Sequence, residues 1–211
     1  MTPKPERLEV VVEVGEKRVF ASALEWPGWS RSAKTREEAI ERLLAYTPRY
    51  GSVAMAAGLG FPDAFEVAVV DQLRGGSGTE FGVPSRIHEA DAKRVTAADA
   101  QRLAALVEAA WLAFDRVAAG APAELRKGPR GGGRDRDKMV GHVIEADAAY
   151  ARELGLRLPQ PDLADRASRL AARDAVLDVL RRPSDGSPIA ERKWTARYAA
   201  RRIAWHALDH A

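Results

Sequence analysis

The chain of 211 residues contains no cysteine. This absence excludes disulfide bonds, thiolate metal sites and catalysis by a thiol of the protein's own. No stretch approaches the roughly 18 consecutive apolar residues that a membrane-spanning helix needs, and the start, MTPKPERLEV, lacks the apolar core of a signal peptide. A cytoplasmic protein without a membrane anchor is therefore expected.

The chain also lacks a strong excess of charge of either sign. It has 33 Lys and Arg against 30 Asp and Glu, for a formal net charge of +3. So small an excess does not by itself indicate nucleic-acid binding. With 46% hydrophobic residues, the chain can build one large or two small globular domains.

The first 90 or so residues carry patterns of strands. Apolar and polar residues alternate at 8–14 and again at 19–24, with Gly15 in a turn between them, which predicts a β-hairpin whose first strand is half-buried. The segment WPGW at 26–29 ends this alternation because of its Pro and Gly.

A helix and one more strand are expected before residue 92. Thr35 and Glu38 form a capping box at the start of an amphipathic helix. The apolar run Phe65–Val70 indicates a strand, and Gly and Pro residues between 75 and 84 indicate a loop. Residues 1–92 are therefore predicted to be a small α+β domain. Trp26 and Trp29 are expected in its core or against a second domain, and His88 on a surface loop.

After residue 93 the pattern becomes helical. Thr96 and Asp99 open the first helix, the spacing repeats at 139–154 and at 163–180, and Pro188 is expected to begin the last helix. Four amphipathic helices in sequence predict an all-α bundle over residues 93–211.

Three of the four histidines lie on two of these helices. His206 and His210 are four residues apart, so they share one helix face, and His142 lies near the apolar face of its own helix. An unpartnered imidazole in a core costs free energy, and a shared divalent metal would remove that cost. The alternative is that they are ordinary histidines of amphipathic helices.

Other polar residues are candidates for the same site. Glu145, one turn after His142, could be a general base, and Arg202, one turn before His206, could pair with a substrate carboxylate. Asp209 adjoins His210. Each of the three could instead be an ordinary surface residue.

The segment RKGPRGGGRDRDK, from Arg126 to Lys138, joins the first two helices of the bundle. Arg126, Lys127 and Arg130 could bind the anionic group of a cofactor, since glycine lets the backbone approach a ligand. The segment could equally be a solvated connector. It has no interleaved aromatic residues that would stack on bases, so nucleic acid is not the expected partner.

The order of these helices and histidines resembles the DinB-like superfamily of metal-dependent four-helix bundles, which is related to thiol transferases that use bacillithiol or mycothiol. That family has one His on the second helix and HxxxH on the last, matched here by GHVIEADAAYAREL around His142 and RRIAWHALDH around His206 and His210. Some thiol-transferring relatives have Glu in place of one His. The resemblance covers roughly residues 96–211.

The resemblance implies a zinc, nickel or iron site and a low-molecular-weight thiol such as mycothiol as cofactor. Three imidazoles leave at least one coordination position open, as in catalytic sites. The expected function is a metal-dependent transferase or isomerase acting on a small-molecule thiol adduct. DinB-like proteins are often dimers, so a homodimer is left open.

The segment LEWPGWSRSAKTREEAIERL, within residues 8–46, resembles the HicB-like antitoxin fold. This resemblance implies a partner-binding role and keeps two alternatives open. One is a non-catalytic protein that binds a metal or a small ligand and uses the HicB-like domain to contact a partner. The other is a toxin–antitoxin or nucleic-acid module, although no added DNA-binding helix pair is evident.

Overall fold

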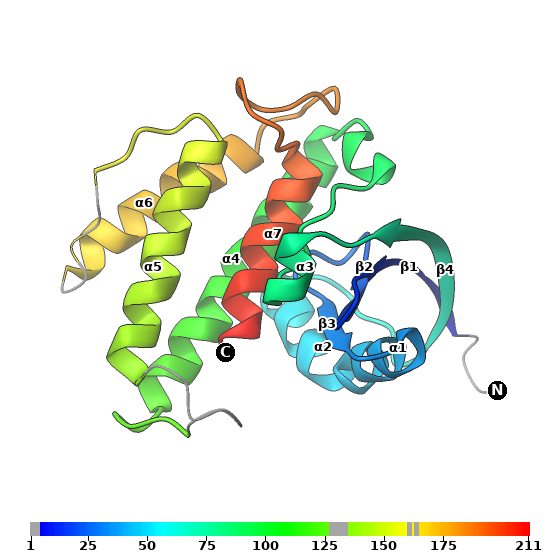
Figure 1. Cartoon of the computed structure of the whole chain (residues 1–211). Helices are drawn as coiled ribbons and strands as arrows, with labels where there is room; N and C mark the ends of the chain where they lie inside the picture. Colours follow the sequence, from blue (N-terminus) through cyan, green and yellow to red (C-terminus); the bar gives the residue numbers. More distant parts are fainter. Residues whose placement is uncertain (1–4, 127–134, 160–161, 163–164) are drawn as a thin grey trace.

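The computed structural model describes residues 5–126, 135–159, 162 and 165–211. It has a four-stranded sheet in the N-terminal half and is mostly helical afterwards (Figure 1). The strands are β1 (Glu6–Val14), β2 (Val19–Ala23), β3 (Ser30–Ala33) and β4 (Phe65–Arg74), in the spatial order β3-β2-β1-β4. The helices are α1 (Arg36–Ala45), α2 (Thr47–Ala56), α3 (Ser77–Phe81), the 3-10 helix η1 (Glu89–Ala92), α4 (Ala97–Gly120), α5 (Arg136–Glu153), α6 (Arg166–Leu180) and α7 (Ala196–Asp209).

The predicted hairpin is confirmed. β1 pairs with β2 antiparallel, and Gly15 N–H donates to the carbonyl of Arg18 at 2.9 Å to close the turn. β1 pairs with β4 in parallel on its other edge. The prediction of a half-buried β1 is wrong in its middle, because Val11 and Glu13 on the second face are also buried.

The two faces of the sheet are covered by different layers. α1 packs on β2 and β3, and Leu43 of α1 is buried in one core cluster with Val10. The other face meets α7, where the Phe20 and Trp205 rings pack edge to face at 6.1 Å. α7 therefore lies between the sheet and α5 (Figure 1).

The WPGW segment forms the turn between β2 and β3. Trp29 N–H donates to the carbonyl of Trp26 at 3.0 Å, and Gly28 has φ +90°. Pro followed by a residue of positive φ is typical of a type II turn. Both tryptophans are buried, and the Trp29 Nε1–H donates to the carbonyl of Leu43 at 2.8 Å.

Helices α4 to α7 pack against one another in the C-terminal half. α4 contacts α6 and α7, and α5 contacts the same two helices. The expected cap of α4 is confirmed: Asp99 N–H donates to Thr96 Oγ1 at 3.2 Å and Thr96 N–H to Asp99 Oδ2 at 3.0 Å. None of the described helices combines the length and apolar character that a membrane span requires.

One apolar core contains residues from both halves of the chain. Val10 and Trp29 of the sheet region belong to the same buried cluster as Leu106, Ile203 and Leu208 of the long helices. The structure therefore joins the N-terminal sheet and the C-terminal helices through shared packing rather than through a linker alone.

Three expectations about local structure are wrong. The last helix begins at Ala196, not at Pro188, because Thr195 Oγ1 caps it by accepting from Tyr198 N–H. His88 is buried rather than on the surface: its Nδ1 accepts from Ala90 N–H at 3.0 Å. Residues 77–81 of the predicted loop form α3. The helix predicted over 163–180 is described as α6 from Arg166 on, and residue 163 lies outside the described residues.

Candidate metal centre

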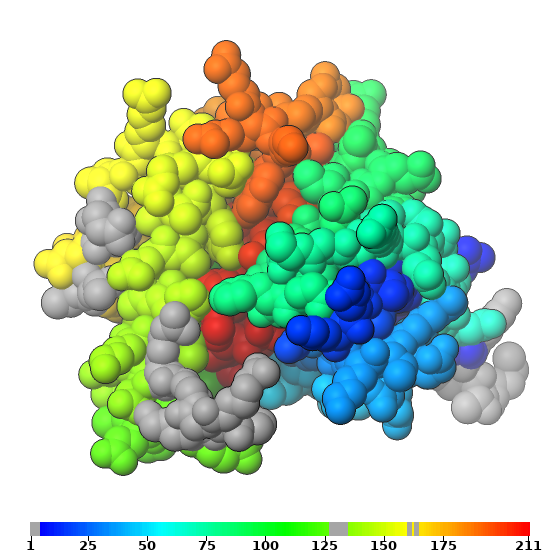
Figure 2. All heavy atoms as spheres, in the orientation of Figure 1, coloured from blue at the N-terminus to red at the C-terminus, as the bar shows by residue number. Residues whose placement is uncertain are grey.

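The histidine triad, His142, His206 and His210, is formed by two helices. His142 is in the middle of α5, His206 is in the last turns of α7, and His210 is the residue that caps the C-terminal end of α7. His206 is buried, whereas His142 and His210 are partly exposed. Figure 2 shows atoms of the end of α7 reaching the surface between α5 and the N-terminal half. The site thus lies at the edge of the helical layer.

The three imidazole rings meet at one point. The ring centroids are 5.1 Å apart for His142 and His206, 5.0 Å for His142 and His210, and 4.7 Å for His206 and His210. Each ring can offer one nitrogen such that all three lie within 4.8 Å of one another. The sequence prediction that two helices bring these side chains together is confirmed.

The closest nitrogen pair has a separation that suits a metal. The Nε2 atoms of His142 and His206 lie 3.3 Å apart. Two metal–nitrogen bonds of about 2.0–2.1 Å at a tetrahedral angle separate their nitrogens by roughly 3.3–3.4 Å. Three neutral nitrogen donors suit zinc, nickel or iron and leave coordination positions for other ligands. The residues present therefore fit a divalent metal.

Aromatic rings surround the triad. The Tyr150 ring packs edge to face on His206 at 5.6 Å, and the Trp205 ring lies 6.2 Å from it. Trp194 packs on Tyr150 at 5.2 Å. Burial raises the pKa of the Tyr150 phenol, and the nearby positive charge of Arg202 opposes that rise. Tyr150 and Trp205 thus pack around the buried ring of His206.

Arg202 lies beside the same rings. Its guanidinium carbon is 5.4 Å from the centroid of Tyr150 and 4.7 Å from that of Trp205. The predicted placement of Arg202 near the triad therefore agrees with the structure. The aromatic residues that hold it were not predicted as site residues. The available signal was helical spacing: Trp205 is three residues after Arg202 on α7, and Tyr150 is eight residues after His142 on α5.

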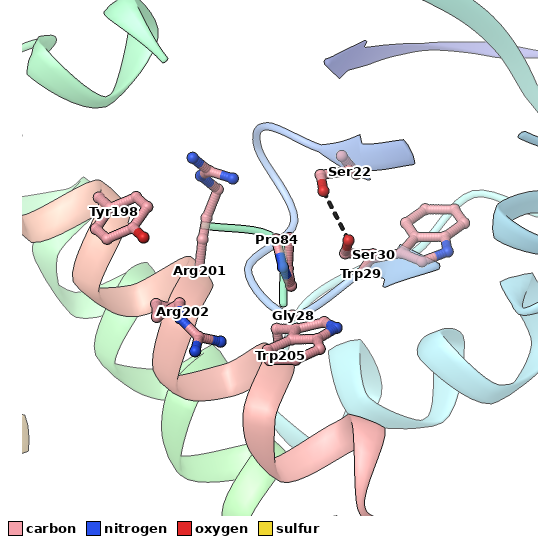
Figure 3. Close-up of a pocket in the computed structure, with 10 residues that line it drawn as sticks. Ser22, Gly28, Trp29, Ser30, Pro84, Tyr198, Arg201, Arg202 and Trp205 are labelled. Carbon is pink, nitrogen blue, oxygen red and sulfur yellow. Dashed lines mark hydrogen bonds between the residues drawn. The ribbon is translucent and has the colours of Figure 1, made fainter. Parts of the chain in front are cut away.

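A small cavity lies next to Arg202, between the sheet and α7 (Figure 3). Its free volume of about 10 Å³ is close to that of one water molecule. Ser22 of β2 and Ser30 of β3 line it and share a hydrogen bond of 2.6 Å. The α7 side is lined by Arg201, Arg202 and Trp205, so α7 presents polar groups to the sheet as well as to the triad.

Three of the other candidate residues are exposed, and two lie outside the described residues. Glu145 is exposed on α5, and Arg126 is exposed after the end of α4. Asp209 is exposed too, next to His210. Lys127 and Arg130 lie outside the described residues. The roles expected for Glu145 and for the basic segment stay predictions.

A second group of charged side chains lies between α4, α5 and α6. Arg173 bonds Asp115 at 2.7 Å and Asp147 at 3.4 Å, and Trp111 Nε1–H donates to Asp147 at 3.1 Å. Burial raises the pKa of Asp147 to about 6, although Arg173 opposes the rise. This group, which no sequence motif predicts, connects α4, α5 and α6.

Comparisons with protein-family models, with curated proteins and with solved structures find no significant match to this chain.

Proposed function

We propose that this protein is a metal-dependent enzyme of the DinB-like kind, which transfers or isomerises a small-molecule adduct with the help of a low-molecular-weight thiol. The observation that carries the proposal is the convergence of three imidazole nitrogens within 4.8 Å. Two further features support it: the histidines occur on the second and last of four packed helices, and part of the triad is open to solvent.

The residues of the site would bind the metal, hold a ligand in place and supply positive charge. His142, His206 and His210 would hold the metal as neutral ligands. A bound divalent metal lowers the pKa of a coordinated thiol, so that the thiolate becomes available as a nucleophile near neutral pH. Tyr150 and Trp205 would hold His206 in place and limit water, and Arg202 would supply positive charge at the site.

The first test is the metal content of the protein purified without chelator, measured by elemental analysis. We expect close to one divalent metal per chain in the wild type and little in the His206→Ala, His210→Ala double variant. The matched control is His88→Asn, because His88 is the one histidine outside the triad, and an Asn side chain can replace it as a cap of η1. The control should keep its metal.

The outcomes separate the candidate functions. If the wild type binds no zinc, nickel or iron even after reconstitution, the proposal is wrong. If metal is bound, the holo-protein is assayed with low-molecular-weight thiols and electrophilic acceptors, by the loss of free thiol. Metal binding with no consumption of any thiol would favour the alternative, a non-catalytic metal protein with a partner-binding HicB-like domain.

A further inference from the structure

The arginines of α7 differ in whether their charge is paired. Arg197 pairs with Glu25 at 3.4 Å, and Arg201 pairs with the buried Asp91. Among the described residues, no carboxylate forms a salt bridge with Arg202, and its buried Nη1 atom has no hydrogen-bond partner. A buried donor on a charged group without an acceptor is costly, and native structures usually supply the acceptor.

Arg202 is also held rigidly at the triad. Its guanidinium packs on the rings of Tyr150 and Trp205, and the same two rings pack on His206. Arg202 and His206 thus share two aromatic neighbours. An arginine fixed in this way loses little side-chain freedom when it binds an anion.

The ligands of the proposed metal add no negative charge. Three imidazoles leave the full charge of a divalent metal, whereas carboxylate or thiolate ligands would reduce it. Arg202, which contacts the same two rings as His206, adds positive charge beside this centre. A site of this kind concentrates anions and disfavours cations.

We infer that the site selects an anionic thiol, whose sulfur reaches the histidine triad and whose carboxylate is bound by Arg202. This inference rests on the proposed function and narrows its substrate class.

The test uses the full-length protein loaded with cobalt(II), whose absorption changes when a thiolate binds. Mercapto acids with chains of increasing length are titrated beside mercapto alcohols of the same lengths, so that each pair has the same chain length and differs in its end group, an anionic carboxylate or a neutral hydroxyl. Because a charge-assisted hydrogen bond is worth about 1.5–3 kcal/mol, we expect the best acid to bind roughly tenfold or more tightly than its alcohol.

Variants of Arg202 test whether this residue causes the preference for mercapto acids over mercapto alcohols. Arg202→Gln should bring the two dissociation constants to within about threefold, and Arg202→Lys, which keeps the charge without the planar fork, should retain part of the preference. The matched control is Arg182→Gln, which removes an exposed arginine beyond the end of α6. This control should bind both thiols as the wild type does. Cobalt stoichiometry and circular dichroism report whether each variant is folded.

The failures can be told apart. A wild type that binds no cobalt overturns the proposed function and this inference together. A wild type that binds cobalt and thiols, but acids no more tightly than alcohols, overturns the anion selectivity and leaves the proposed function standing. A preference that survives in folded Arg202→Gln shows that Arg202 is not the anion-binding residue.

Discussion

The carboxyl group of Asp147 is a sensitive reporter of how α4, α5 and α6 pack. Its side chain is 11% exposed and lies against the Arg173 guanidinium and the Trp111 indole. Burial raises its pKa from the ordinary value of 3.8 to about 6. The folded protein therefore binds this proton more tightly than the unfolded chain does, and the stability of the protein must depend on pH.

The sign and the size follow from the two pKa values. Well below pH 4 the carboxyl group is protonated in both states and contributes no difference. Between pH 4 and 6 the unfolded chain has lost the proton and the folded protein keeps it, so the free energy of unfolding falls as the pH rises. The fall ends above pH 6 and amounts to roughly 3 kcal/mol, since one pKa unit corresponds to about 1.4 kcal/mol.

The assay is urea denaturation of the metal-free wild type and of Asp147→Asn at several pH values from 4 to 7.5. Asparagine keeps the shape and can still accept from Trp111, but it does not titrate. The wild type should lose roughly 2.5 kcal/mol relative to the variant across this window, because a small part of the fall lies below pH 4. Asp115→Asn, which removes the exposed partner of Arg173 and leaves Asp147 in place, should still show the decline. Parallel profiles of the wild type and Asp147→Asn would refute the reasoning.

Three other perturbations test the packing around the triad. Gly28→Ala should cost about 2 kcal/mol or more by thermal or urea unfolding, because Gly28 has φ +90° and an added Cβ would lie 2.9 Å from Leu208 and 3.0 Å from Ala204; an unchanged melting temperature would argue against this close approach. Asp91→Ala should cost about 3–5 kcal/mol because it leaves Arg201 buried without its partner, and Asp91→Asn with Arg201→Met should recover part of the loss; equal stability of the single and the double variant would contradict this. Zinc at a free concentration of 100 times its dissociation constant should stabilise the wild type by about 2.7 kcal/mol and leave the double histidine variant unchanged, as measured by calorimetry.

The sequence predicts most of the regular structure here because strong local signals exist. Alternation identified β1 and β2, and the paired side chains at Thr96 and Asp99 located the start of α4 to the residue. β3 was not predicted as a strand, since its four residues, SRSA, carry no apolar alternation. α2 was not predicted because no side chain caps its start and glycine within it is a weak helix former.

The candidate site was predictable in part for a similar reason. The four-residue spacing of His206 and His210 is local, and a helix converts it directly into proximity. The position of His142 depends on how α5 packs against α7, which the sequence suggests only through the order of helices. Local sequence does not indicate that, among the described residues, Arg201 forms an ion pair and Arg202 does not. Asp91, the partner of Arg201, lies 110 positions away in the chain.

The N-terminal half matters to the triad because it fixes the helix that carries two of the three histidines. α7 is held against the sheet by the Arg201–Asp91 ion pair, by the edge-to-face contact of Phe20 with Trp205, and by the close approach of Gly28. Each of these contacts lies within two turns of His206. A shift of α7 by a fraction of an ångström would change the nitrogen separation that suits a metal, and metal affinity is sensitive to such changes. Substitutions in the sheet should therefore weaken metal binding even where they touch no ligand, which a bundle acting alone would not show.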